Sequence, residues 1–124
     1  AGTIHVRVKK MEEAGIITGS SLRLDYDKLG YSFIAFLGIF LIKTSQTQFV
    51  LERLNAIPHV TVAHVTTGKF NIFCKIRAQN TSHAKDLIYS IDDIEGVSRT
   101  ETMISLEESI NDKKRLMHKI FQDI

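Results

Sequence analysis

Phe33–Ile42, FIAFLGIFLI, is the stretch of sequence that decides the fold: ten residues without a charge, several of them β-branched or aromatic. A run of this length is too short to cross a bilayer, and we expect it to form a central β-strand. Alternate side chains of a strand point to opposite faces, and here both faces are apolar. The helices of a small α+β domain cover only one face, so a second copy of the chain is the expected cover of the other. The sequence therefore predicts a dimer.

The expected dimer contact uses apolar side chains of this strand and of a segment that precedes it. Residues 21–25 alternate polar and apolar side chains like an exposed strand, and we interpret them as part of a hinge. The residues expected at the dimer interface are Phe33, Ile34, Phe36, Phe40, Leu22 and Leu24.

Length and composition limit the class of protein. A chain of 124 residues has room for one domain of about 100 residues and a short appendage. Its 44% hydrophobic and 24% charged residues are ordinary for a globular protein, and nothing resembles a signal peptide or a spanning helix, so we expect a cytoplasmic location. The single cysteine, Cys74, excludes an internal disulfide, and we expect it to be buried. A net charge of +2 does not by itself indicate nucleic-acid binding.

Beyond the first strand, hydrophobic periodicity predicts a helix that opens with a capping box at 45–48, and later a hairpin that turns at Gly68. The expected elements are helix 45–57, strands 60–66 and 70–78, helix 81–91 and strand 97–106. The residues expected to share one face of the second hairpin strand are Phe70, Ile72, Cys74 and Ile76. Two βαβ halves joined by a hairpin close as a ferredoxin-like α+β sandwich, with both helices on one face and the first strand inside the sheet.

The two ends of the chain carry amphipathic patterns. Near the N-terminus, Ile4, Val8 and Met11 recur at helical spacing, and a basic surface lies on the opposite side. Near the C-terminus, residues 116–124 show helical spacing after a Lys-Lys-Arg run, which predicts a docked amphipathic helix, with a last strand as the alternative.

Three segments resemble the Lrp/AsnC family, the feast/famine transcription regulators of bacteria and archaea. Thr3–Ile17 is similar to the recognition helix and following turn of that family's helix-turn-helix, while Thr66–Asn71 and Gly96–Thr102 resemble hallmark segments of its ligand-sensing domain. Family members carry two further helices before the recognition helix. On this basis the chain divides into a recognition-helix remnant (1–16), a hinge strand and linker (17–31), a ferredoxin-like effector-binding and oligomerisation domain (32–107) and a C-terminal amphipathic segment (108–124).

The resemblance implies a dimer whose sheets face each other, further assembly into tetramers or octamers, and an amino-acid effector bound between dimers. The family's effector site lies near the glycine hairpin and the fourth strand, and Asn71 stands where many members have an acid. The expected effector-binding residues are Thr67, Gly68, Lys69, Phe70, Asn71, Thr100 and Thr102. Without the resemblance, the sequence predicts a plain turn at the hairpin, and Thr100 and Thr102 are interpreted as good strand formers.

The resemblance also implies DNA binding through the complete helix-turn-helix. Recognition helices enter the major groove by their N-terminal residues, and the expected DNA contacts are Thr3, His5, Arg7, Lys9 and Lys10. Without the resemblance, the same surface is an ordinary solvated helix face. The predicted function is sequence-specific transcriptional regulation in which a small effector, expected to be an amino acid, controls the assembly. The alternative is a stand-alone metabolite-binding module that acts by protein contact without binding DNA.

No pattern in the sequence indicates an enzyme, a metal site or a cofactor. His59 and His64 are five residues apart and point to opposite sides of a strand, and the other histidines are scattered. The sequence has neither a phosphate loop nor a dinucleotide-binding fingerprint. A ferredoxin-like enzyme such as an acylphosphatase would need a phosphate-binding loop with a catalytic arginine and asparagine, which we do not find.

Overall fold

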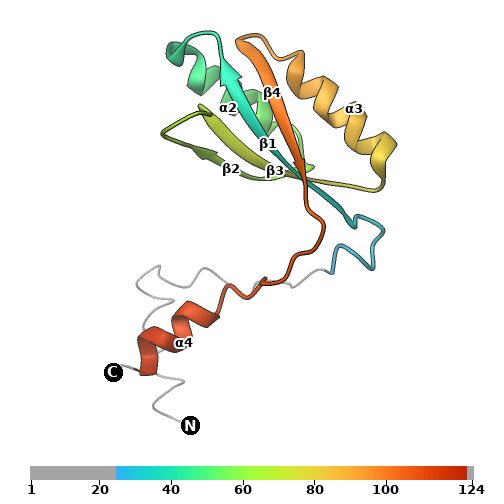
Figure 1. Cartoon of the computed structure of the whole chain (residues 1–124), viewed down its shortest axis with the longest axis vertical. Helices are drawn as coiled ribbons and strands as arrows, with labels where there is room; N and C mark the ends of the chain where they lie inside the picture. The colour runs from blue at the N-terminus through green and yellow to red at the C-terminus, as the bar shows by residue number, and fades with distance from the viewer. Residues whose placement is uncertain (1–24, 123–124) are drawn as a thin grey trace.

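The structure, a computed structural model, describes residues 25–122 and contains a four-stranded antiparallel sheet with the strand order β2-β3-β1-β4 (Figure 1). The predicted ferredoxin-like α+β order is confirmed, with the first strand inside the sheet. In chain order the elements are β1 (Phe33–Leu41), the 3-10 turn η1 (Thr44–Gln46), α2 (Thr47–Asn55), β2 (Val60–Val65), β3 (Ile72–Ala78), α3 (Thr81–Asp92), β4 (Val97–Ile104) and α4 (Arg115–Gln122).

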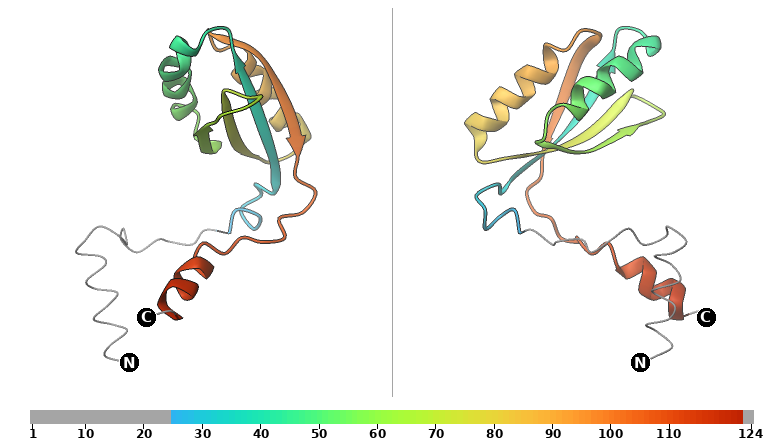
Figure 2. Two further views of the ribbon diagram at one scale, coloured as in Figure 1. Left: turned by 60° about the vertical axis from the view of Figure 1, so that its left-hand side comes forward. Right: turned by 180° about the vertical axis from the view of Figure 1, so that it is seen from behind.

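Helices α2 and α3 cover one face of the sheet and form the core with it (Figure 2). On β1, the core face is Ala35, Leu37 and Ile39, all with no exposed surface. Burying a leucine or isoleucine side chain stabilises the fold by about 1.5–3 kcal/mol. Cys74 is buried in the same core, as predicted, and burial raises the pKa of its thiol to about 11. The thiol is therefore a small apolar group rather than a nucleophile.

The two covering helices begin in different ways. The predicted capping box at 45–48 is wrong: α2 follows the turn η1, its N-cap is Gln46 without a side-chain capping bond, and the Thr47 hydroxyl instead donates to the Thr44 carbonyl at 2.6 Å. Helix α3 begins with a side-chain cap, because the His83 backbone N–H donates to Oδ1 of Asn80 at 2.8 Å. The first helix therefore starts through a tight turn and the second through a cap.

A bulge in β4 changes which of its side chains reach the core. Val97 pairs with Leu41 and packs against the core, but the register then shifts, so that Arg99 pairs with Phe40. A β-bulge adds one residue to one strand and re-aims the side chains that follow it. As a result, the odd-numbered residues after Val97 lie on the face of the sheet that α2 and α3 leave open.

The prediction that Phe70 shares a face with Ile72, Cys74 and Ile76 is wrong. Strand β3 begins only at Ile72, whose alternate residues are buried under the helices. Phe70 lies before the strand, and its ring occupies the space where a Cβ of Gly38 would be, on the open face. The missing side chain at Gly38 is what allows the ring to cross over β1.

The segments that lead into β1 and out of β4 leave the same end of the sheet, and α4 stands apart from the sheet (Figure 1). Arg77 on β3 contacts both segments. In the segment before β1, its guanidinium pairs with Asp27 Oδ1 at 3.1 Å and donates to the Tyr31 carbonyl at 3.0 Å. In the segment after β4, it lies 3.9 Å from Glu108 Oε1. Lys75 pairs with the same Glu108 carboxylate at 2.9 Å. We call Arg77, Asp27 and Glu108 the Arg77 clasp.

The helices that the structure describes include none long and apolar enough to span a membrane. Several expectations lie outside the described residues: the recognition helix, the hinge residues Leu22 and Leu24, and all five expected DNA contacts.

Candidate functional site

The open face of the sheet carries four phenylalanines in mutual contact. Phe36 stacks on Phe73 with ring centroids 5.8 Å apart, Phe73 lies 6.1 Å from Phe70, and Phe70 meets Phe40 edge-on at 5.2 Å. We call these four residues the phenylalanine row. All four are half-buried, and within residues 25–122 no helix covers them. An apolar surface of this kind, continuous over neighbouring strands, is typical of an interaction site.

The hairpin between β2 and β3 places Phe70 at one end of the row. Gly68 adopts φ +95°, a conformation that glycine takes without a steric penalty. The Thr66 hydroxyl donates to the Phe70 carbonyl at 2.8 Å, and the Thr66 N–H donates to the Asn71 carbonyl at 3.1 Å. These bonds hold the loop so that Phe70 points onto the sheet.

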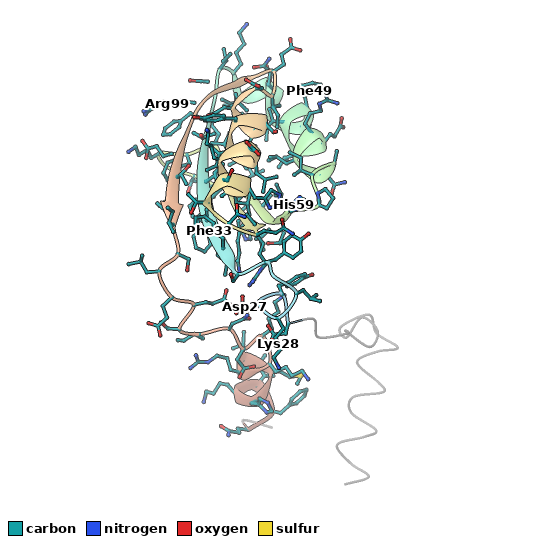
Figure 3. All side chains as sticks on the ribbon, turned by 90° about the vertical axis from the view of Figure 1, so that its right-hand side faces the viewer. Asp27, Lys28, Phe33, Phe49, His59 and Arg99 are labelled. Carbon is teal, nitrogen blue, oxygen red and sulfur yellow. The ribbon has the colours of Figure 1, made fainter. Side chains whose placement is uncertain are left out.

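Three charged side chains gather beside this end of the row. Glu101 Oε1 lies 3.2 Å from Lys69 Nζ and 3.7 Å from a guanidinium nitrogen of Arg99. The Arg99 guanidinium also sits 4.2 Å from the centroid of the Phe40 ring. Figure 3 shows Arg99 on the side of the sheet away from the helices. We call Lys69, Arg99 and Glu101 the charged triad.

The charged triad is accessible to a ligand. The side chains of Lys69 and Arg99 are 64% and 61% exposed, so their ion pairs with Glu101 contribute little to stability. Two cations that share one carboxylate provide one excess positive charge next to an aromatic surface. Chemically, the arrangement suits a small molecule that carries a carboxylate, and Glu101 offers an acceptor for an ammonium group.

The Lrp/AsnC ligand binding domain model matches residues 34–114, which contain the sheet except for its first residue, Phe33, and both covering helices. The chain belongs to the Lrp/AsnC family. The regulatory protein AsnC of Escherichia coli is 39% identical over 110 residues, which cover 88% of this chain and 72% of that protein. The solved structure of E. coli AsnC aligns with a TM-score of 0.82 at 36% identity, covering 90% of this chain and 75% of that one. A feast or famine regulatory protein from M. tuberculosis, complexed with L-methionine, aligns with a TM-score of 0.77 at 25% identity, covering 90% and 76%.

These findings confirm the resemblance to Lrp/AsnC regulators and the ferredoxin-like ligand-binding fold. The similar proteins are named as regulators rather than as enzymes. In this Lrp/AsnC chain, the phenylalanine row and the charged triad lie inside the matched range.

The structure brings only part of the expected effector residues together. Thr100 and Thr102 pair with Ile39 and Leu37 of β1 and so lie on the helix-covered face, opposite Phe70. The Thr100 hydroxyl donates to Asp92 Oδ1 at 2.8 Å, which ties β4 to the end of α3. Neither threonine belongs to the same surface as the hairpin.

Asn71 has a structural role in this fold. Its side-chain Oδ1 accepts from the Leu41 N–H at 2.9 Å, and its own backbone N–H donates to the Ile39 carbonyl at 3.0 Å. The amide therefore closes the end of the ladder between β1 and β3, next to the point where the β4 register shifts. Its acceptor oxygen is already used by the backbone.

The expected interface residues also separate by face. Phe33 packs against the helix-covered core, whereas Phe36 and Phe40 belong to the phenylalanine row and Ile34 alternates onto the same open face. Sequence reasoning missed Phe70 and Phe73 as parts of this surface, and it missed Arg99 and Glu101 as neighbours of Lys69. The signal that was available is strand parity, but the β4 bulge reverses that parity after Val97.

Other chemistry-bearing groups lie elsewhere. His59 and His83 pack edge-on with centroids 4.7 Å apart, and Nδ1 of His83 accepts from the Gln79 N–H. Over residues 25–122, no group of three or more histidine, cysteine, aspartate or glutamate side chains is arranged to hold a metal ion. A hollow of about 470 Å³ lies between α2 and β2, and none of the expected effector residues lines it.

Proposed function

We propose that this chain is the effector-binding and assembly part of a cytoplasmic DNA-binding transcriptional regulator, and that a small effector, an amino acid, controls its oligomeric state. The observation that carries the proposal is the open face of the sheet, where the phenylalanine row ends at the charged triad. Membership of the Lrp/AsnC family supports the regulatory role.

The proposed dimer places a second copy over the phenylalanine row. The four rings are half-buried and continuous, and charged side chains flank them: the charged triad lies beside Phe40 and Phe70, and Lys75, which pairs with Glu108, lies beside Phe36. An apolar centre with a charged rim is the usual anatomy of a protein interface. Two such faces packed together would bury the surface that α2 and α3 leave open.

The proposed effector site is the charged triad with the hairpin. An amino acid's carboxylate is attracted by Lys69 and Arg99, and its ammonium group by Glu101. The M. tuberculosis relative was solved with L-methionine, which supports an amino acid as the ligand class. Because the triad lies at the edge of the proposed dimer face, ligand binding there changes the charge at the contact between copies and shifts the population of oligomers.

The proposed DNA contacts are Thr3, His5, Arg7, Lys9 and Lys10. In a dimer, two recognition helices meet DNA half-sites about one helical turn, or a multiple of it, apart. A change of assembly, up to tetramers or octamers, therefore changes which operators the protein can bridge. The full helix-turn-helix supplies this contact.

Isothermal titration of the chain with a panel of amino acids tests the effector site. We expect at least one amino acid to bind, and Lys69→Met to weaken that binding by about tenfold or more, the loss of one charge-assisted contact. Lys85→Met, on the helix-covered side, is the matched control and should bind as the wild type does. Failure of every amino acid to bind, or an equal loss in both variants, would sink the effector proposal.

A salt-dependent gel shift with the protein that carries the complete helix-turn-helix tests DNA binding. We expect Arg7→Ala to weaken the shift while the native mass stays unchanged. Effector binding without any DNA shift would favour the stand-alone metabolite-binding module.

A further inference from the structure

Strand β2 lies at an edge of the sheet and lacks the features that usually keep a strand edge from pairing. Within residues 25–122 it pairs only with β3, and its residues 61–65 are exposed (Figure 1). Charged side chains, proline or bulges normally protect the unpaired backbone groups of an edge strand. The other edge strand, β4, carries Arg99, Glu101 and a bulge. By contrast, Val60–Val65 contains no lysine, arginine, acidic residue or proline.

The backbone groups of Ala63 and Val65 point away from the sheet. In an antiparallel ladder, successive residues direct their N–H and C=O groups alternately to the two sides of the strand. The Thr66 N–H donates to the Asn71 carbonyl at 3.1 Å, on the side of β3. His64, two residues earlier, therefore directs its backbone groups to β3, and Ala63 and Val65 direct theirs outward. The register shift of β2 lies at its start and leaves this part of the strand regular.

Beside this edge the chain carries both an apolar projection and an apolar hollow. The Val65 side chain is 61% exposed and lies on the helix-covered side, because Val65 pairs with the buried Ile72. The hollow of about 470 Å³ between α2 and β2 is on the same side, and its apolar lining includes Leu51, Leu54 and Ala63. A projection and a hollow on one strand are what a two-fold contact between identical surfaces requires.

We infer that β2 pairs with β2 of a second copy in antiparallel orientation, about a two-fold axis at His64. In this register Ala63 lies opposite Val65 of the second copy, and the two residues exchange their outward N–H and C=O groups. Side chains that lie directly opposite share one face, so each Val65 points toward the hollow of the other copy. A strand without charged residues also pairs with itself without like-charge repulsion.

The edge contact and the proposed open-face dimer use different surfaces. The phenylalanine row lies on a face of the sheet, whereas the outward groups of Ala63 and Val65 lie along its edge. A chain that makes both contacts assembles beyond a dimer, and either contact can fail without the other. The edge contact does not depend on the effector or on DNA binding.

Disulfide trapping in the 124-residue chain tests the register. Because His64 bonds β3, its pair across the axis is non-hydrogen-bonded, with Cα atoms about 4.5 Å apart, which a disulfide can span. Val62 is exposed on the same face, but its symmetry mate lies about 13 Å away along the strand. We expect His64→Cys to link two copies about tenfold faster than Val62→Cys. Cys74 is buried and does not compete, and equal rates would overturn the inference.

Hydrogen exchange of single amides separates the edge contact from contact through the open face. The Ala63 and Val65 amides should exchange about tenfold more slowly as the protein concentration rises, because only a second copy offers them acceptors. The His64 amide bonds β3 and is the internal control, with the same protection at every concentration. Fast exchange of Ala63 and Val65 in the associated protein would overturn the inference.

The variant Val65→Asp extends this test to a chain that is fully associated at every concentration used. A carboxylate in place of the apolar projection should speed exchange of the Ala63 amide about tenfold or more. Ile104→Asp is the matched control, because Ile104 is 55% exposed at the end of the other edge strand. It should leave the Ala63 amide within about twofold of the wild type. Equal exchange in the two variants would contradict pairing through β2.

Discussion

Leu37 and Phe36 are neighbours in the sequence and lie on opposite faces of the same strand. Leu37 has no exposed surface under α2 and α3, whereas Phe36 is half-buried and faces away from both helices. The chain itself covers one face of the sheet with two helices. The other face carries four phenylalanines in contact with one another, which no helix in residues 25–122 covers. The difference separates two properties: the covered face stabilises the fold, and the open face is the surface through which we propose that the chain assembles.

The largest expected effect is at the covered face. Leu37→Ala leaves a cavity in the core and should lower the free energy of unfolding by about 2–5 kcal/mol. Urea denaturation at two protein concentrations measures it. Because Leu37 packs only within its own chain, the loss of unfolding free energy should be the same at both concentrations. A loss that depends on concentration would contradict the assignment of Leu37 to stability rather than assembly.

The matching change on the open face is Phe73→Asp. A carboxylate in the middle of the phenylalanine row should weaken self-association by about 2–4 kcal/mol, a factor of about 30 to 1,000 in the dissociation constant. Sedimentation over a dilution series measures it. Phe49→Asp on α2, where Phe49 is 42% exposed, is the control and should leave association unchanged. Equal effects of the two variants would contradict the assignment of this face.

Gly38→Ala tests the position of Phe70 on the open face, because a Cβ at residue 38 would overlap the Phe70 ring. We expect a loss of about 1–3 kcal/mol in the free energy of unfolding, the usual cost of overpacking. In a Phe70→Ala background the same change should cost less than about 0.5 kcal/mol. A double-mutant cycle by urea denaturation gives the coupling, and simple additivity would mean that Phe70 does not lie over Gly38.

The smallest expected effect on stability is at the ion pair of Lys75 and Glu108. Lys75 donates to the Glu108 carboxylate and holds the pKa of that carboxyl below its ordinary value of 4.5. A carboxyl whose pKa is lower in the folded chain stabilises the fold above the unfolded-state pKa, and this contribution is lost as the pH falls through the folded-state pKa. Glu108→Gln should therefore destabilise the protein slightly at pH 7 and not at pH 3. Thermal melts at both pH values check this, with Glu107→Gln as the control; a pH-independent difference would count against the ion pair.

Strands β1 and β4 show which features of the fold can be predicted from the sequence and which cannot. The apolar run at 33–42 predicted a strand inside the sheet with two apolar faces, because strand alternation depends only on local geometry. The same rule fails in β4, where the bulge after Val97 turns Arg99 and Glu101 toward the open face and Thr100 and Thr102 toward the helices. A bulge depends on pairing with a distant strand, so periodicity within one segment does not show it.

The errors around the hairpin have a related cause. Strand alternation predicts that Phe70 shares a face with Ile72, two residues later. However, the Asn71 side chain accepts a hydrogen bond from the end of β1, and β3 begins only after Asn71. The contact of His59 with His83 joins residues far apart in the sequence and was likewise not foreseen. The predicted DNA contacts lie outside the described residues and stay predictions.

The native mass of the 124-residue chain at micromolar concentration is the most direct test of the claim that a second copy covers the open face. We expect a particle of at least twice the chain mass of 14.0 kDa. A particle of 14.0 kDa, with the phenylalanine row left bare to solvent, would contradict the account.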